Sequence, residues 1–310
     1  RLVYRAPPRL NFGGPPPTAG RLPQIPPFPD SAALVRFDLA TRKLDTVTWF
    51  KTPKVNLNVT QSPDGGIRVL PIVNPLPQGD DWAILPDGTI ALVRGRDFHV
   101  DWMGPQGTTT SPKIPFDWEH LSDEAKVALI DSSKIALEMA RAGGQFNLFG
   151  QAIARGAGEI VGGAPRDSAR RNGAPRDGES STGASSPPST GTMTVTTGGN
   201  TIVTSVGPGG GGAGGQLPPL TMIPASELPD YKPAFAPGST RADADGNLWI
   251  RTTQNVNARP VYDVVNRKGQ LIDRVQLPQN RALVGFGPNG VVYLGVRDAT
   301  TAHLEKARIK

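Results

Sequence analysis

The sequence predicts a mainly β fold, and three observations carry this prediction. Short stretches that alternate apolar and polar residues recur along the chain, and Asp-Gly or Asn-Gly pairs separate several of them. Gly and Pro are abundant, at 37 and 32 of 310 residues, as in turn-rich β proteins. The opening at Asp243 recurs at Gly287, about 44 residues later, which is a blade-like period. The predicted fold class is therefore mainly β, as a partial or complete β-propeller with a helical and low-complexity insertion.

Residues 1–30 are predicted to form a Pro-rich extended arm. Proline removes backbone donors and favours polyproline-like chain, so this segment cannot enter a central strand. We expect the arm to lie along a partner or to hang free. Its arginines precede the first acidic residue, Asp30, and we expect them to bind the partner, although such charges can also serve only solvation. These arginines are Arg1, Arg5, Arg9 and Arg21.

The first set of blades is expected at 31–116. Strand patterning begins at Leu34, turns at 40–43 and resumes at 44–50. A second unit begins at Trp82, turns at Asp87-Gly88 and continues through 98–103 to a turn at 104–107. Neighbouring blades of this kind bury their faces against each other.

A long insertion is expected at 117–238. A helix is predicted over 122–141, because Ser122 can cap it, two acids follow, and Gly143-Gly144 ends it. Val127, Ile130 and Leu137 lie near one face, so we expect this helix to pack on the β domain. Residues 162–192 have the composition of a disordered segment, 193–206 that of a small hairpin, and a Gly-rich linker follows. The segment contains a second basic cluster, predicted to bind a partner, with Arg166, Arg170 and Arg171.

The last set of blades is expected at 239–310. Three pieces of the chain share the layout of strand, polar turn and strand: 34–50, 98–116 and 260–278. Turns at Asp245-Gly246 and Asn289-Gly290 precede further strands, and Asp64-Gly65 is another candidate turn. The chain thus holds three to four blade equivalents, fewer than the usual six or so. We expect the ring to be incomplete, or to be closed by other residues or by a partner.

Composition limits the function classes. Cysteine is absent, which excludes disulfides and thiol chemistry and is compatible with the cytosol or a bacterial periplasm. No apolar run approaches the roughly 18–20 residues of a membrane span. The net charge of +6 favours an anionic partner, yet no aromatic residue is interleaved with the arginine clusters to stack bases. We therefore expect no nucleic-acid partner.

The residues of catalytic and metal sites do not form a recognisable pattern. His99, His120 and His303 lie in separate contexts without paired zinc spacing. The stretch 243–247 supplies alternating oxygens but lacks the later residues of an EF-hand loop, and a β-turn accounts for it. We predict no catalytic residue, no metal and no cofactor. The tryptophans are expected to fill the core between blades, with ligand platforms as the alternative: Trp49, Trp82, Trp102 and Trp118.

The stretch from Asp243 to Arg251, Asp-Ala-Asp-Gly-Asn-Leu-Trp-Ile-Arg, resembles the strand opening of NHL-like six-bladed β-propellers. Residues 82–91, 260–264 and 284–290 are similar to the C-terminal part of bacterial secreted six-bladed propellers. The resemblance covers 34–116 and 239–310 and implies the fold rather than an activity. The chain is also similar in kind to extrinsic periplasmic subunits bound to photosynthetic reaction-centre complexes.

We expect a non-catalytic scaffolding or binding subunit that is periplasmic and peripheral to the membrane. It would dock on and stabilise a larger, membrane-bound complex, for which a photosynthetic reaction centre is the candidate. The expected partners are protein subunits, with a membrane surface as a further candidate and no small-molecule substrate. The alternative, which the propeller resemblance implies, is a metal-dependent hydrolase of the lactonase type.

Overall fold

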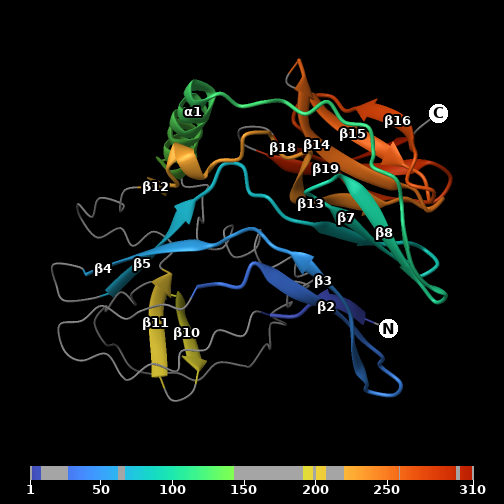
Figure 1. Cartoon of the computed structure of the whole chain (residues 1–310), viewed down its shortest axis with the longest axis horizontal. Coiled ribbons are helices and arrows are strands. Elements are labelled where there is room, and N and C mark those ends of the chain that lie inside the picture. The colour runs from blue at the N-terminus through green and yellow to red at the C-terminus, as the bar shows by residue number, and fades with distance from the viewer. Residues whose placement is uncertain are drawn as a thin grey trace, which may run out of the picture.

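The computed structural model describes residues 2–7, 27–61, 67–142, 191–197, 200–206, 220–257, 259–297 and 301–308. In this part of the chain the protein is mainly β, with several separate antiparallel sheets and one α-helix. Figure 1 shows the sheets arranged side by side, with the helix α1 at the opposite side of the molecule from strands β7 and β8. No helix among these residues is both long and apolar enough to cross a membrane.

The first two sheets lie next to each other. Sheet A has the order β1-β2-β3 and consists of Leu2–Arg5, Ser31–Phe37 and Leu44–Lys51. Sheet C has the order β6-β7-β8-β9 and consists of Asp81–Ile84, Ile90–Arg94, His99–Gly104 and Gly107–Thr110. Leu34 and Phe50 of sheet A pack against Ile90 and Leu92 of sheet C. Burial of these side chains joins the two sheets.

Two further sheets follow in chain order. Sheet F has the order β13-β14-β15-β16 and consists of Phe235–Ala242, Leu248–Val256, Arg259–Val265 and Leu271–Gln276. Sheet G has the order β17-β18-β19 and consists of Arg281–Phe286, Val291–Arg297 and Ala302–Arg308. One apolar cluster joins sheets C and F around Phe98 and Ile250, and another joins F and G around Trp249 and Leu294.

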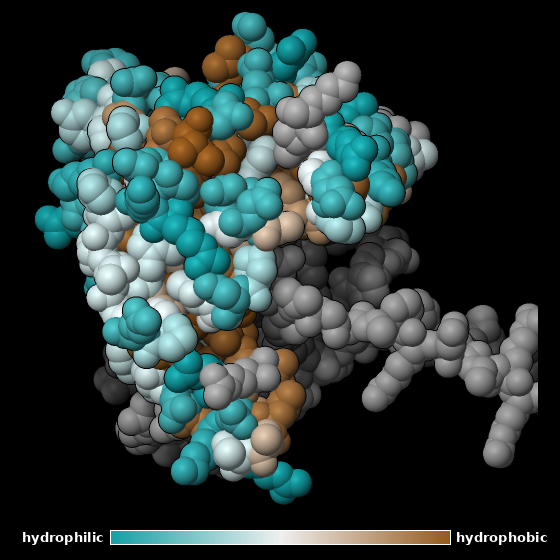
Figure 2. Space-filling model, turned by 90° about the vertical axis from the view of Figure 1, so that its right-hand side faces the viewer, coloured by the Kyte–Doolittle hydropathy of each residue, from teal (hydrophilic) through white to brown (hydrophobic). Residues whose placement is uncertain are grey.

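Sheets A, C, F and G therefore form a stack in which each pair of neighbours shares an apolar cluster. Sheets C and F are covered on both faces, whereas A and G each pack through one face. The adjoining strands β6 and β13 are also tied by a polar contact, because the Thr240 amide donates to Oδ2 of Asp81 at 2.7 Å. On the side drawn in Figure 2, hydrophobic residues lie in separate patches among hydrophilic ones.

The remaining elements lie outside this stack. Sheet B joins β4 (Asn56–Gln61), β5 (Ile67–Val73) and β12 (Thr221–Met222), and β12 runs parallel to β5. The strands β10 (Gly191–Thr197) and β11 (Asn200–Val206) form the hairpin expected at 193–206. A 3-10 helix, η1 (Ala225–Glu227), lies beside α1 (Asp123–Ala142). Sheet B thus unites strands separated by about 150 residues of sequence.

The hairpins turn where the sequence predicts. Asn289 and Gly290, between β17 and β18, both have positive φ, the conformation of a tight turn whose twist matches the flanking strands. Gly88 and Gly246 likewise have positive φ in the turns before β7 and β14. The candidate turn at Asp64-Gly65 and the segment 162–190 lie outside the described residues.

Two expectations about packing are wrong. Residues 2–5 are not part of an extended arm, because β1 pairs antiparallel with β2 in sheet A. This short run alternates side chains and precedes the first proline, so it can join a ladder. The expected packing face of α1 is also wrong at Val127, which is 50% exposed, and the main contact of the helix is with η1, outside the stacked sheets.

The helix begins and is held as its sequence indicates. Oγ of Ser122 accepts a hydrogen bond from the Ala125 amide at 3.2 Å, and Asp123 and Glu124 occupy the first turn. Nζ of Lys126 lies 2.7 Å from Oδ1 of Asp230, which joins α1 to the segment before sheet F. The Asp230 carboxylate raises the pKa of Lys126, and Lys126 in turn lowers the pKa of Asp230.

A buried acid in sheet F gives a first testable prediction. Asp263 is fully buried; Oδ1 accepts from Nε of Arg274 at 2.8 Å, and Oδ2 has no hydrogen-bond partner. Burial raises the pKa of Asp263 more than the Arg274 guanidinium lowers it. The folded state therefore holds this proton more tightly than the unfolded chain. The resulting stability is complete below the usual Asp pKa of about 3.9 and is lost as pH rises through the raised pKa.

Asp263→Asn should therefore reduce the loss of stability that accompanies a rise in pH above about 3.9. The measurement is the free energy of unfolding in urea at a series of pH values. Asp273→Asn, on the neighbouring strand and exposed, is the matched control. An unchanged pH dependence in Asp263→Asn would show that the buried carboxyl is not the source of the effect.

Candidate functional site

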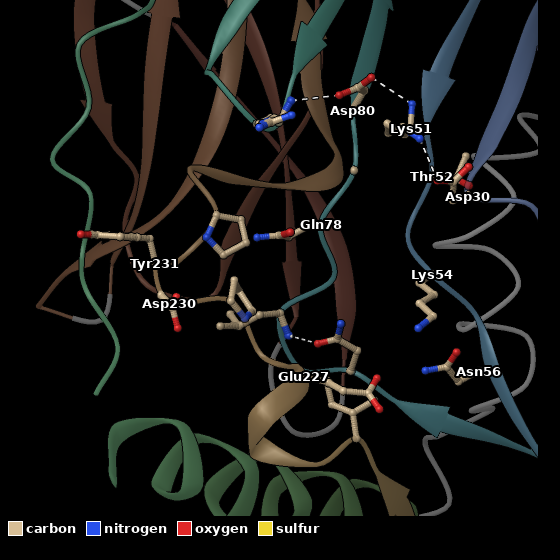
Figure 3. A pocket seen from close by; sticks show the side chains of 18 of the residues that line it. Asp30, Lys51, Thr52, Lys54, Asn56, Gln78, Asp80, Glu227, Asp230 and Tyr231 are labelled. Atoms are coloured by element: carbon tan, nitrogen blue, oxygen red, sulfur yellow. Dashed lines mark hydrogen bonds and ion pairs between the residues drawn. The ribbon is translucent and has the colours of Figure 1, made fainter. Parts of the chain in front are cut away.

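A cleft of about 1490 Å³ lies where sheets A, B and C meet the segment that leads to sheet F. It is lined by charged and amide side chains, for which we call it the polar cleft, and also by apolar ones such as Trp118 and Ile223. Figure 3 shows Lys54 and Asn56 on one side of it and Asp230 and Tyr231 on the other, with Gln78 between them. Asp80 lies at one end and Glu227 near the other. The walls come from strand ends and turns rather than from strand faces. These are the positions at which a rigid scaffold usually presents binding groups.

Asp80, directly before β6, fixes the wall of the cleft. Its Oδ2 accepts from the Lys51 amide at 2.9 Å, and its Oδ1 accepts from the Gly95 amide at 3.0 Å. The Asp80 amide donates in return to the Lys51 carbonyl at 2.8 Å. One nearly buried carboxylate therefore holds together the end of β3, the start of β6 and the turn after β7.

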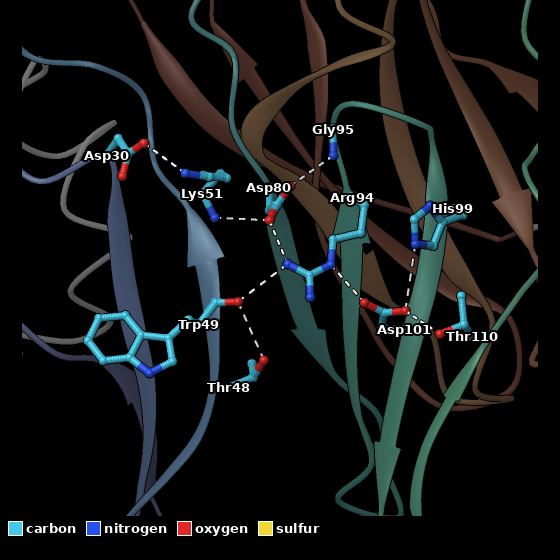
Figure 4. A network of polar contacts seen from close by, with 10 residues as sticks. All are labelled: Asp30, Thr48, Trp49, Lys51, Asp80, Arg94, Gly95, His99, Asp101 and Thr110. Carbon is cyan, nitrogen blue, oxygen red and sulfur yellow. Dashed lines mark hydrogen bonds and ion pairs between the residues drawn. The ribbon is translucent and has the colours of Figure 1, made fainter.

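Arg94, at the end of β7, extends this contact across sheet C (Figure 4). Nη1 donates to Oδ2 of Asp80 at 2.9 Å, and Nε donates to Oδ2 of Asp101 on β8 at 2.7 Å. Nη1 also reaches the Trp49 carbonyl on sheet A at 3.3 Å. Burial alone would raise the pKa of Asp101, but hydrogen bonds from Thr110 and Arg94 outweigh it and lower that pKa. Arg94 thus acts as a tether between sheets A and C.

The backbone of the β7–β8 turn passes unusually close to the segment that precedes β6. A Cβ atom added to Gly95 would overlap the carbonyl oxygen of Gly79. A Cβ added to Gly79 would lie 3.1 Å from the Lys51 carbonyl oxygen. Glycine at these two positions therefore permits close packing of three segments at the rim of the cleft.

Most acidic side chains at the rim of the cleft form hydrogen bonds or ion pairs within the protein, whereas several other polar side chains there do not. Asp30 pairs with Nζ of Lys51 at 2.7 Å, and this ion pair lowers the pKa of Asp30. Within the described residues, no hydrogen bond or ion pair engages the side chains of five groups that line the cleft: Lys54, Asn56, Gln78, Arg96 and Glu227. Two of these groups are cations, one is an anion and two are amides. They are available for a ligand.

The outer face of sheet A is a second exposed feature. Cross-strand pairing places Leu2 opposite Phe37 and Phe37 opposite Leu44 on one face, and Tyr4 opposite Val35 on the same face. Ala33 and Trp49 form the next row of that face. Trp49 is 62% exposed and Leu44 is 56% exposed, whereas Ala33 and Val35 are buried. We call these seven side chains the outer face of sheet A; the only polar residue paired within its rows is Thr46.

Only Arg5, among the arginines predicted to bind a partner, lies within the described residues. Arg5 lies in β1 opposite Leu34, and its Nε is buried without a hydrogen-bond partner. Burial lowers the pKa of the Arg5 guanidinium. Six of the predicted residues lie outside the described part of the chain: Arg1, Arg9, Arg21, Arg166, Arg170 and Arg171.

The histidines remain in three separate places. Nε2 of His99 lies 3.6 Å from Oδ1 of Asp101, and Nε2 of His303 lies 3.6 Å from Oε1 of Glu305. The His120 ring packs edge-on against Tyr231, with 5.2 Å between ring centroids. Among the described residues, no group of His, Asp and Glu side chains is arranged to hold a metal ion.

The turn at 243–247 uses its oxygens internally. Oδ1 of Asp243 accepts from the amides of Asp245 and Asn247, and Oδ2 accepts from the side chains of Asn247 and Trp249. This arrangement agrees with the expected β-turn. The tryptophans divide: Trp102 is buried and Trp82 packs between sheets A and C, but Trp49 and Trp118 are exposed. The core prediction is therefore wrong for the last two.

The cleft was not predicted from the sequence. Its one local signal is Asp80-Asp81, two acids placed directly before a buried strand, where unpaired charge would be costly. Chemically, the arrangement offers fixed hydrogen-bonding groups and free charges of both signs, which suit binding. No protein-family model, no curated protein and no solved structure matches this chain.

Proposed function

We propose that the protein is a non-catalytic binding and scaffolding subunit that docks on a larger assembly and stabilises it. The observation that carries this proposal is the outer face of sheet A. Its opposite face packs on sheet C, yet this face exposes Trp49, Leu44 and Leu2. Exposed apolar side chains gathered on one face of a sheet are typical of protein interaction sites.

We further propose that the stacked sheets are blades of an incomplete β-propeller. Sheets A, C, F and G follow each other in chain order, and sheets C and F are four-stranded meanders. Blades of propellers pack face to face through such apolar clusters. Among the described residues, no apolar cluster joins the outer face of sheet A to a further sheet, and this supports binding of a partner there. The periplasmic location and the membrane-bound reaction-centre complex remain predictions from the sequence.

Trp49→Glu should abolish most of the association with the native assembly while leaving the fold intact. The substituted side chain projects from an exposed position, so the folded core is not disturbed, whereas a buried carboxylate at an interface is costly. The measurement is recovery of the tagged protein's co-purifying subunits, with the unfolding midpoint as a check on stability.

Leu304→Glu is the matched control, because Leu304 is an apolar residue of similar exposure on sheet G, at the other end of the stack. We expect this variant to retain its partners. Equal retention by wild type, Trp49→Glu and Leu304→Glu would remove the outer face of sheet A from the proposal.

A further inference from the structure

We propose that the polar cleft binds an extended polypeptide segment that carries both acidic and basic side chains. This inference rests on the proposed function, since it assigns the partner subunit a second point of contact. The cleft lies beyond the edge of the outer face of sheet A and shares with it the end of β3. The argument has three steps: the charges of the cleft, its size and its rigidity.

The free charges decide the chemical class of the ligand. Lys54 and Arg96 are exposed cations and Glu227 is an exposed anion, and none of the three has a partner within the described residues. A ligand that excludes water from these groups must supply opposite charges, because covering an unpaired charge is strongly unfavourable. A neutral oligosaccharide supplies neither sign, and a nucleic acid supplies only negative charge beside Glu227 and Asp230. A polypeptide can supply both signs.

The side-chain amides of the cleft also favour a polypeptide ligand. Asn56 and Gln78 each offer a carbonyl oxygen and an NH₂ group, and neither is engaged within the described part of the chain. A peptide group presents the complementary pair of one N–H and one C=O. Oδ1 of Asn74 accepts from the Leu76 amide at 2.9 Å, and its Nδ2 has no hydrogen-bond partner among the described residues.

The size and rigidity of the cleft favour a chain over a small molecule. Its volume of about 1490 Å³ exceeds the range of roughly 300–1,000 Å³ typical of small-ligand pockets. The Asp80 contacts and the close approach of Gly95 to Gly79 fix one wall before binding. A preformed wall lowers the entropy lost on binding and so suits recognition of a flexible segment.

The experiment is selection from a phage-displayed library of random dodecapeptides on the purified full-length protein. Peptides bearing both an acidic and a basic residue should be enriched. Selected peptides should bind Lys54→Glu and Glu227→Lys at least about tenfold more weakly, since each reversal replaces an attraction by a repulsion. Selection on Lys54→Glu should enrich a basic residue where the wild type enriches an acidic one. Lys268→Glu, in the exposed turn between β15 and β16, is the control and should bind like wild type.

Three results would overturn the proposal. The first is that no peptides are enriched, and the second is that the enriched peptides bind Lys54→Glu and Glu227→Lys as tightly as wild type. The third is that neutral oligosaccharides from a glycan array bind specifically and compete with the peptides for the cleft. Trp49→Glu separates this inference from the proposed function: it should lose the assembly but still bind the selected peptides. If Trp49→Glu still co-purifies with the assembly while peptide binding still requires Lys54 and Glu227, the proposal for the outer face of sheet A is wrong and the proposal for the cleft is supported.

Discussion

Arg94→Leu is expected to lower the free energy of unfolding by about 3 kcal/mol, the low end for a broken buried ion pair because the guanidinium keeps some contact with water. The substitution removes a side chain that touches Asp80, Asp101 and the Trp49 carbonyl together. Asp80 and Asp101 are both buried, so their carboxylates lose a counter-charge that water cannot replace.

The measurement is urea unfolding followed by far-ultraviolet circular dichroism. Arg267→Leu is the control. Nη1 of Arg267 lies 2.6 Å from Oδ2 of Asp87, but both side chains are exposed, and exposed ion pairs contribute little to the free energy of unfolding. Arg94→Leu should also loosen the contact of sheet A with sheet C, and so increase amide exchange in β3. Similar losses in both variants would contradict the role of Arg94 as a tether.

Gly95→Ala should destabilise the protein by about 2 kcal/mol, within the range of roughly 1–3 kcal/mol for overpacking. The new methyl group would overlap the carbonyl oxygen of Gly79, and backbone on both sides prevents an easy escape. Separation of these segments would also weaken the hydrogen bond from the Gly95 amide to Asp80, which helps to fix the wall of the cleft.

Gly104→Ala provides the comparison, since a Cβ there would meet only Oγ1 of Thr89 at 3.8 Å. Thermal unfolding of both variants should show a clear decrease in the midpoint for Gly95→Ala and almost none for Gly104→Ala. If Gly95→Ala were as stable as wild type, the close approach of Gly95 to Gly79 would not be a feature of the folded protein.

The sequence predicts the strands and turns well where the signal is local. The alternation in 34–50, the turn at Asp87-Gly88 and the turn at Asn289-Gly290 all lie in hairpins whose partners are adjacent in the chain. Sheet B is different: the pairing of Thr221 with Ile72 spans about 150 residues, and no local pattern specifies it. β1 is not predicted, because the many prolines in residues 1–30 favour an extended segment over a strand.

The cleft depends still more on contacts between residues far apart in the sequence. The Lys51 amide reaches Asp80 across 29 positions, and Arg94 reaches the Trp49 carbonyl across 45. Sequence patterns show that each residue is polar, but not that backbone groups of another strand meet it. Alternation likewise predicts that Ala33, Val35 and Phe37 share a face of β2, yet which face meets sheet C depends on how the sheets stack.

The most direct test of the binding-subunit proposal is hydroxyl-radical footprinting, read by mass spectrometry, of the protein alone and within its gently isolated native assembly. Trp49 should be oxidised rapidly in the free protein and protected in the assembly. Trp249, which is 5% exposed between sheets F and G, should be protected in both states and serves as the internal reference. Equal oxidation of Trp49 in the two states would contradict the proposal that a partner covers the outer face of sheet A.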